Sequence, residues 1–398
     1  MRSLSFVLFF AVALALDGAL HWFLWVRLVL DPSWPRGLER VLTAVVVGLA
    51  LGVPVGMVAA RFAPRALAEP IATGIFVWMG ALFIMVSVLI AAEILRWAVI
   101  GGAAAYAKLG GGGGGDSVDL ARRELLSRSV AVAATVATGG LSTAALRSGL
   151  ADVETREVAV RLPRLPPALS GLTLVQLSDL HVGPLIGRRF VDTIVDRANA
   201  LSPDVLVITG DLVDGDVARL REHTAALARL RARWGVYFVT GNHEYYSGVE
   251  GWLAELHRLG VRVLRNERVI LGDSAASIDL AGVDDSSADR FGFGHGADLE
   301  RAVRGRDAER ELILLAHQPK AIADAARHGV GLQLSGHTHG GQIWPFNHVV
   351  GLVQPYVAGL HRHTELTQIY VSRGTGFWGP PMRLNAPAEI TKVVLSPG

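Results

Sequence analysis

Three apolar stretches near the N-terminus are each long enough to cross a lipid bilayer: residues 4–30, 41–60 and 71–95. A spanning helix takes about 20 apolar residues, because the hydrocarbon core is about 30 Å thick. Lipid offers no hydrogen bonds to the backbone, so stretches of this kind can only be helices. Hydrophobic residues make up 51% of the chain, and the excess lies in its first third. We therefore expect a transmembrane helical region with three spans over residues 1–109.

A fourth apolar segment, residues 130–150, is weaker and rich in Ala, Thr and Gly. It is either a fourth span or a signal-like helix. The preceding residues 110–129 are Gly-rich and Arg-rich, and the glycine run at 110–115 disfavours helix and strand because its backbone entropy is high. We expect a flexible linker there. Arg122 and Arg123 within it are either ordinary flanking charge or an export signal.

Arg and Lys in the short loops indicate the orientation, because cytoplasmic loops carry an excess of them. The first loop holds Arg36 and Arg40, whereas the opposite side has only three basic residues. The loop between the third and fourth segments is the richest: Arg96, Lys108, Arg122, Arg123 and Arg128. We therefore expect a multi-pass protein of the cytoplasmic membrane. If the fourth segment crosses, everything after about residue 150 lies on the extracytoplasmic face.

Three polar side chains interrupt the first span. Asp17 and His21 are four residues apart, on one face of a helix, and Arg27 follows nearer the end. Polar groups at membrane depth indicate function by default. The structural alternative is preferred here: Asp17 and His21 satisfy each other, and Arg27 extends to the interface.

Beyond residue 150 the chain changes character, and short buried-strand patterns alternate with helical ones. The expected strands are residues 172–177, 204–208, 236–239, 311–316 and 332–334, and the expected helices are residues 190–200 and 219–231. Such alternation predicts a layered α/β domain over residues 151–398. Ligands in these folds bind at the carboxyl ends of the strands.

Each of the five expected strands ends in a side chain that can bind a metal. These side chains are Asp179, His181, Asp211, Asn242, His317, His337 and His339. One such residue alone has an ordinary structural explanation. Their occurrence at all five strand ends is improbable by chance and favours a metal site. The chain has no cysteine, so its ligands are oxygen and imidazole. That set suits manganese, iron or zinc and suits magnesium less well.

These residues form a pattern of short motifs: Asp179-x-His181, Gly210-Asp211-x-x-Asp214, Gly241-Asn242-His243-Glu244, His317 and Gly336-His337-x-His339. The pattern resembles the signature of the calcineurin-like metallophosphoesterase superfamily and covers about residues 172–395. Details such as GNHEYYSG and GHTHGGQ resemble its membrane-associated YkuE-like branch, which includes a vertebrate transmembrane phosphoesterase. The resemblance implies a four-layer αββα sandwich with a dinuclear metal site at the strand C-termini, following N-terminal transmembrane helices.

The resemblance also assigns roles to the residues. One divalent ion is expected on Asp179, His181, Asp211 and His339, and a second on Asp211, Asn242, His317 and His337. His243 is expected to act on the substrate, and Asp214 is expected to orient the His243 ring. Glu244 is expected to cap a helix or to form a local salt bridge, and it is given no catalytic role.

A membrane-anchored hydrolase of phosphodiesters, or of phosphomonoesters, is the favoured function, with direct attack by a metal-bridging hydroxide. A non-enzymatic membrane receptor or scaffold that retains the fold is the alternative. The substrate is expected to be a phosphate ester of lipid or cell-envelope origin. Six aromatic residues either line an apolar cleft for it or pack in the core: Tyr245, Tyr246, Trp252, Trp344, Phe377 and Trp378. A net charge of +2 without a basic block indicates no nucleic-acid partner.

Overall fold

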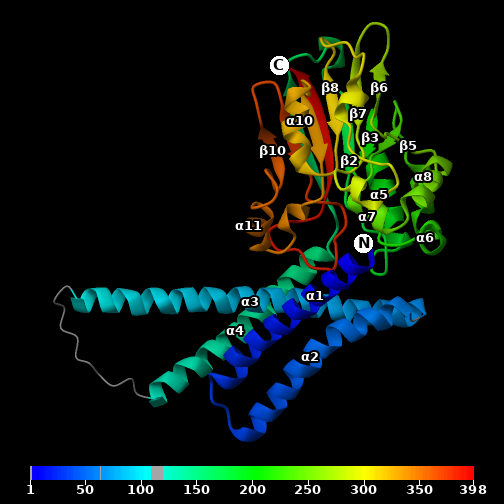
Figure 1. The fold of residues 1–398 in the computed structure, drawn as a ribbon. Coiled ribbons are helices and arrows are strands. Elements are labelled where there is room, and N and C mark those ends of the chain that lie inside the picture. Colours follow the sequence, from blue (N-terminus) through cyan, green and yellow to red (C-terminus); the bar gives the residue numbers. More distant parts are fainter. Residues whose placement is uncertain (1, 63, 109–119) are drawn as a thin grey trace. The chain divides into compact units, whose positions relative to one another are not determined.

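The computed structural model describes residues 2–62, 64–108 and 120–398 and divides the chain into two compact units, Met1–Leu146 and Arg147–Gly398 (Figure 1). The glycine run at 110–115 lies outside the described residues. Residues 120–129, expected as part of the linker, belong to a helix.

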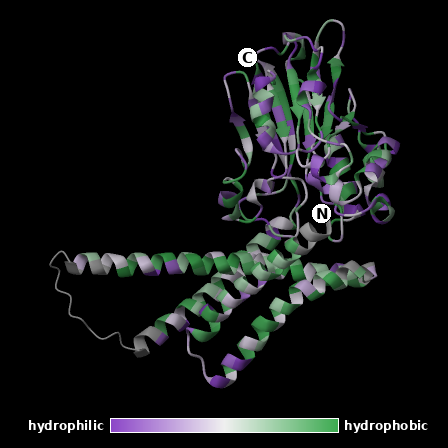
Figure 2. Ribbon diagram, viewed as in Figure 1, coloured by the Kyte–Doolittle hydropathy of each residue, from purple (hydrophilic) through white to green (hydrophobic). Residues whose placement is uncertain are grey.

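The first unit is built from long apolar helices, which Figure 2 colours mainly as hydrophobic. They are α1 (Arg2–Trp25), continued by a π-helical segment (Val26–Leu30), α2 (Arg36–Phe62), α3 (Arg65–Lys108) and α4 (Leu120–Gly149). Four stretches have the length and hydropathy to cross a membrane: Phe10–Leu30, Arg36–Ala59, Leu67–Gly102 and Glu124–Gly149. The fourth segment, the weakest by sequence, is thus a continuous apolar helix.

Polar groups of the first helix are paired within this unit. Nδ1 of His21 lies 2.9 Å from the backbone oxygen of Asp17 and 3.2 Å from its carboxylate. Trp78 of α3 donates a hydrogen bond to Nε2 of the same ring at 3.0 Å. Arg27 forms ion pairs with Asp31 at 2.7 Å and Glu93 at 2.8 Å, so carboxylates neutralise it.

The second unit contains two six-stranded mixed sheets. Sheet 1 has the order β1 (Glu154–Leu162), β12 (Glu389–Pro397), β2 (Thr173–Leu177), β3 (Val205–Ile208), β4 (Val236–Phe238) and β5 (Arg262–Val263). Sheet 2 has the order β10 (Gly359–Arg362), β11 (Gln368–Val371), β9 (Leu332–Ser335), β8 (Leu312–Leu315), β7 (Ser277–Gly282) and β6 (Glu267–Gly272). The central strands β2, β3 and β4 run parallel, as do β7, β8, β9 and β11.

Alternating side chains of the central strands fill separate cores on the two faces of each sheet. In β3, Val205 and Val207 face the core between the sheets, whereas Leu206 and Ile208 face helices. In β8, Ile313 belongs to the same inter-sheet core, and its neighbours face the other way. Successive residues of a strand point to opposite faces, so strands buried on both faces must be apolar throughout.

Helices cover the outer face of each sheet. Sheet 1 is covered by α5 (Arg188–Ala200), α6 (Val217–Thr224) and α8 (Val249–Arg258), and sheet 2 by α9 (Leu299–Val303) and α10 (Ile322–Arg327). In α5, Val191, Ile194, Val195 and Ala198 are buried, and this spacing defines one face of a helix. The layers confirm the expected αββα arrangement.

One expected helix is shorter than the sequence suggested. The pattern over residues 219–231 predicted one helix, but α6 begins at Val217 and ends at Thr224, and a 3₁₀ turn over Ala225–Arg229 follows. The Thr224 hydroxyl donates to the carbonyls of Leu220 and Arg221, at 3.4 and 3.2 Å. This bonding competes with the regular helical pattern, so the helix tightens at this point.

Candidate metal centre

The expected ligands converge from both sheets. Asp179 and His181 follow β2, Asp211 follows β3, and Asn242 begins α7 (Asn242–Tyr246) directly after β4. From sheet 2, His317 follows β8, and His337 and His339 follow β9. The carboxyl ends of these parallel strands lie at one edge of the two sheets, which brings the seven side chains together.

The first cluster of metal-binding side chains consists of Asp179, His181 and His339. Nε2 of His181 lies 3.1 Å from Nε2 of His339, and the latter atom lies 3.5 Å from Oδ1 of Asp179. Two nitrogens that bind one ion at about 2.0–2.1 Å lie about 3 Å apart. All three side chains are buried, so little solvent competes for the site.

The second cluster consists of Asp211, His317 and His337. Nε2 of His317 lies 3.1 Å from Oδ2 of Asp211 and 3.2 Å from Nδ1 of His337. Nδ1 of His317 donates to the backbone oxygen of Thr209 at 2.7 Å, which fixes the ring and leaves Nε2 for a ligand. Oδ2 of Asp211 also lies 3.9 Å from Nε2 of His181 in the first cluster. Asp211 therefore faces both clusters.

His337 and His339 serve different clusters although they are two residues apart. The backbone at these two residues is not extended but left-handed, with φ of 71° at His337 and 51° at His339. Asp179, His181 and Asp211 also adopt positive φ, between 50° and 53°. Such a conformation costs a residue other than glycine about 1–2 kcal/mol, and it concentrates at functional sites. Five of the seven expected ligands are held in this way.

Two glycines let the backbone approach the carboxylates closely. A Cβ on Gly241 would collide with the carboxylate of Asp211, and one on Gly336 with that of Asp179 and the hydroxyl of Ser178. Any side chain at these positions would displace an expected ligand.

Asn242 provides a test of whether these residues fit metal ions. Its Oδ1 atom is buried and has no hydrogen-bond partner within the described residues. A buried amide oxygen without a partner costs free energy, and coordination to a cation would satisfy it. Because the clusters combine this oxygen with carboxylates and imidazole nitrogens, the residues fit two divalent ions.

Asp214 holds two histidines with one oxygen. Its Oδ1 atom lies 2.9 Å from Nδ1 of His181 and 2.7 Å from Nδ1 of His243. An ionised carboxylate only accepts hydrogen bonds, so both Nδ1 atoms carry protons. Nε2 of His243 is turned toward Asp211, 3.9 Å from its Oδ2 atom. The structure thus places His243 beside the clusters and shows that Asp214 contacts an expected ligand as well.

The clustered charges change the protonation of the site. Burial of Asp214 opposes its ionisation, but the two imidazoles bonded to it lower its pKa to about 2. Burial opposes protonation of His243, yet Asp211 and Asp214 raise its pKa to about 9. Burial and the neighbouring His317 lower the pKa of His337 to about 4. His337 is therefore neutral at pH 7, the form in which histidine binds metals.

Glu244 caps the start of α7, as expected, and also connects two strand-end loops, which the sequence did not indicate. Its buried carboxylate accepts hydrogen bonds from the backbone of Gly241 at 2.7 Å, Asp211 at 3.0 Å and Leu212 at 2.8 Å. Burial, together with the charge of Asp211, raises its pKa to about 7. Glu244 positions Asp211 through the backbone.

Arg383 is a second residue that sequence reasoning missed. Its side chain is fully buried and donates to the carbonyls of Ala386 at 2.6 Å, Arg373 at 2.9 Å and Gly374 at 3.4 Å, and also to Gly376. Burial lowers its pKa to about 10. This guanidinium shapes the loop beside the first cluster, and no motif in the sequence signals it.

The aromatic residues divide between core and surface. Tyr246 and Trp378 are exposed and flank His243 edge-to-face, with ring centroids 5.2 and 5.7 Å away. Trp344 is exposed as well, whereas Tyr245 and Trp252 are buried and Phe377 is partly buried against the core.

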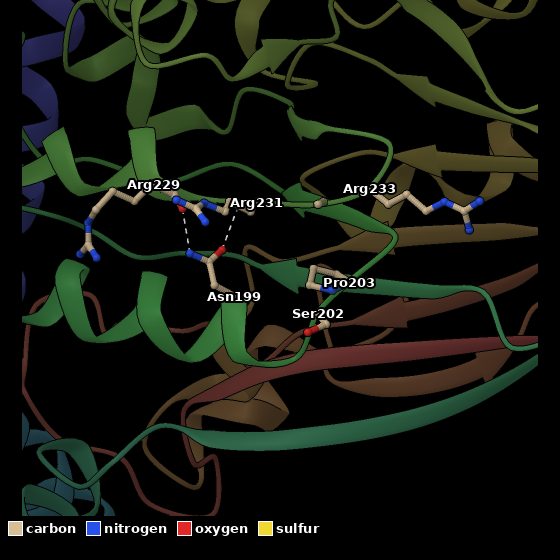
Figure 3. Close-up of a pocket in the computed structure, with 7 residues that line it drawn as sticks. Asn199, Ser202, Pro203, Arg229, Arg231 and Arg233 are labelled. Carbon is tan, nitrogen blue, oxygen red and sulfur yellow. Dashed lines mark hydrogen bonds between the residues drawn. The ribbon is translucent and has the colours of Figure 1, made fainter.

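A separate hollow of about 600 Å³ lies at the end of α5 and is lined by Asn199, Ser202, Pro203, Arg229, Arg231, Ala232 and Arg233. Figure 3 shows Asn199 joined to the backbone of residues 229 and 231, with hydrogen bonds of 2.7 and 2.8 Å. One of its arginines, Arg229, is paired with Asp192 and Asp196. None of the expected ligands lines this hollow.

Comparisons with known proteins agree with this geometry. The family described as calcineurin-like phosphoesterase matches residues 172–341. The chain is 45% identical over 289 residues to the transmembrane protein with metallophosphoesterase domain of Bos taurus, covering 70% of this chain and 64% of that protein. It therefore spans less than two thirds of that relative.

Two bacterial relatives are covered almost completely. An uncharacterized metallophosphoesterase of Aquifex aeolicus is 35% identical over 230 residues, 58% of this chain and 87% of that protein. The metallophosphoesterase YkuE of Bacillus subtilis is 32% identical over 254 residues, 61% of this chain and 85% of that protein. With these matches and the two-sheet fold, the chain belongs to the calcineurin-like metallophosphoesterase family.

Proposed function

We propose that this protein is a membrane-anchored, metal-dependent phosphoesterase that hydrolyses a phosphodiester, or a phosphomonoester, by direct attack of water at phosphorus. The observation that carries the proposal is the position of Asp211, whose Oδ2 atom faces Nε2 of His317 in one cluster and of His181 in the other. A carboxylate shared by two clusters is the arrangement that a dinuclear site requires.

The ligands are proposed to divide around this shared carboxylate. Asp179, His181, Asp211 and His339 would hold one ion, and Asp211, Asn242, His317 and His337 the other. Manganese, iron or zinc suits this donor set. Two such ions would supply Lewis-acid charge to the phosphoryl oxygens and a water of lowered pKa for the attack.

His243 is proposed to stabilise the phosphoryl group or to protonate the leaving oxygen. Asp214 fixes its tautomer by accepting from Nδ1, which directs Nε2 toward Asp211. The ring is only partly buried, so a substrate can reach it. Tyr246 and Trp378 contact this ring in T-shaped geometry and are exposed, so in this proposal they would flank the departing group. They would favour a leaving group with an apolar part.

The four apolar helices anchor the enzyme in this proposal. The excess of Arg and Lys in the loops after the first and third spans puts these loops in the cytoplasm. With four crossings, the phosphoesterase domain faces the extracytoplasmic side of the cytoplasmic membrane. A phosphate ester of a lipid or of the cell envelope is the substrate that an anchored enzyme would meet there.

The proposal is tested by purifying the full chain in detergent, loading it separately with Mn²⁺, Fe²⁺ or Zn²⁺, and assaying four substrate classes. These are phosphomonoesters, simple phosphodiesters, nucleotides and phospholipid head groups. We expect metal-dependent phosphate ester hydrolysis that Asp211→Asn abolishes. Tight binding of two ions without turnover of any class would instead favour a receptor or scaffold.

A further inference from the structure

A group of exposed apolar side chains follows the metal-binding loop. It comprises Trp344, Val349, Leu352 and Val353, exposed by 50%, 51%, 84% and 75%, and is called here the apolar apron. Val349 of the apron lies on the short helix α11 (Phe346–Val350), Trp344 precedes this helix, and Leu352 and Val353 follow it. No Asp, Glu, Lys or Arg occurs between Arg327 and Arg362, although charged residues make up 19% of the chain. Exposed apolar patches of this kind mark interaction sites.

The apron is fixed to the metal centre. Trp344 follows His339 by five residues, and its backbone N–H donates to the carbonyl of Leu384 at 3.1 Å. Gln342 lies between His339 and Trp344 in the sequence. Its side chain accepts a hydrogen bond from the backbone N–H of Trp378 and donates one to the Trp378 carbonyl, both at 3.0 Å. Trp378 in turn contacts His243. A surface that the apron contacts would therefore lie next to His243.

The chain enters this domain at the same edge. β1 begins at Glu154, which pairs with Glu389, and the backbone N–H of Glu389 donates to the carbonyl of Gly374 at 3.0 Å. A Cβ on Gly374 would lie 3.1 Å from Cβ of Asp179 and 3.2 Å from Nδ1 of His339. The start of β1 and the metal centre are therefore neighbours. In Figure 1, α11 and α7 lie at one end of the two-sheet unit and the C-terminus at the other.

Only a short connection separates this edge from an apolar helix. Helix α4 ends at Gly149, so four residues precede Glu154. Five Cα–Cα steps span at most about 18 Å. The stretch Glu124–Gly149 of α4 has the length and hydropathy to cross a membrane. If α4 spans a bilayer, the edge that carries the metal centre starts within that distance of the lipid surface.

We propose that the apolar apron inserts into the surface of the bilayer in which the chain is anchored, and that the metal centre acts on a phosphate ester carried by a lipid of that bilayer. The second part rests on the proposed function. Tryptophan is enriched at the interface of membranes, and aliphatic residues without charged neighbours enter it at low cost. A polar protein partner would leave these apolar side chains without apolar contacts.

The insertion can be measured on the full chain, because it has no native cysteine. Val353→Cys is labelled with an environment-sensitive fluorophore, and the protein is placed in phosphatidylcholine–phosphatidylglycerol nanodiscs with or without doxyl-labelled lipid. Ile270→Cys is the matched control, because Ile270 is 55% exposed on β6, away from α11 (Figure 1). We expect a blue shift and a loss of emission with doxyl lipid at position 353 and neither change at position 270.

A second measurement separates docking from catalysis. Leu352→Glu with Val349→Glu should lower hydrolysis of a phosphate-ester lipid in nanodiscs, and in the labelled Val353→Cys chain the same pair should abolish the quenching. Hydrolysis of soluble p-nitrophenyl phosphate should stay unchanged, and Ile270→Glu should alter neither rate. Lipid quenching at position 353 without hydrolysis of any ester supports the docking surface and refutes the proposed function. Equal emission at positions 353 and 270 with doxyl lipid, or crosslinking of residue 353 to a second copy or another protein, overturns the apron as a lipid contact.

Discussion

Asp214 accepts a hydrogen bond from Nδ1 of His181 at 2.9 Å, and it does so with the oxygen that also bonds His243. With Nδ1 held by this bond, Nε2 of His181 is the ring nitrogen that can bind an ion. One carboxylate thus orients an expected ligand and the residue that is proposed to act on the substrate. Substitution of Asp214 should therefore affect both metal affinity and turnover, whereas substitution of His243 should affect turnover alone.

His243→Ala should keep both ions and lose turnover. None of the expected ligands is altered, and kcat should fall by about 10² to 10⁴, the usual contribution of a positioned acid. The loss should be smaller for p-nitrophenyl esters, whose leaving group needs little protonation, than for alkyl esters. Metal analysis and kcat for the two ester types measure this. Equal losses would make His243 an electrostatic contact, and lost metal would make it a ligand.

Asp214→Asn should weaken one ion as well as turnover. The neutral amide no longer holds His181 in its tautomer, and loss of such a partner lowers metal affinity by about 10- to 100-fold. Titration of the stripped full chain against a competing chelator measures the affinity, with His243→Ala as the matched control. Wild-type affinity in Asp214→Asn would show that its bond to His181 is unimportant.

Asp211→Asn should lower occupancy of both ions together with activity, because this carboxylate faces both clusters. Asp324→Asn is a suitable control, since that aspartate lies on α10 and pairs with Arg327 on the surface. Elemental analysis counts the ions per chain. Two ions with normal turnover in Asp211→Asn would disprove a shared ligand.

Arg383→Met should destabilise the domain by on the order of 3 kcal/mol, because it leaves several buried carbonyls without a donor. Arg327→Met removes only an exposed ion pair and should change stability by less than about 1 kcal/mol. Thermal unfolding of both variants in detergent compares them. An unchanged midpoint for Arg383→Met would mean that the loop of residues 373–386 is held by other contacts.

A reporter fused after Gly398 tests the topology. With four spans and the observed loop charges, alkaline phosphatase at this position should be active, because the enzyme functions outside the cytoplasm. Fluorescence from a reporter that matures only in the cytoplasm would place the domain inside and contradict the positive-inside assignment.

The strands could be predicted because the central ones are buried on both faces. Residues 205–208 are apolar without interruption, and the polar motif begins directly where the strand ends. The buried face of α5 could be predicted for a similar reason, since Val191, Ile194, Val195 and Ala198 recur at helical spacing. Local patterns and short motifs were enough for the fold class.

Long-range pairing left no comparable signal. β1 pairs in parallel with β12, and Glu154 and Glu389 are far apart in sequence. The alternation Val158, Val160, Leu162 indicates a strand there but not its partner. The burial of Arg383 depends on four carbonyls that only the folded loop brings together.

The division of the expected ligands between the two sheets has a consequence for synthesis of the protein. A nascent chain that has reached Asn242 carries only the sheet 1 ligands, and the set is complete only at His339. Ions would therefore be acquired after the sheets have met face to face. Each bound ion would then favour the assembled state by mass action, because the unfolded chain offers no complete coordination sphere. Metal content would thus report directly on how many chains have completed folding.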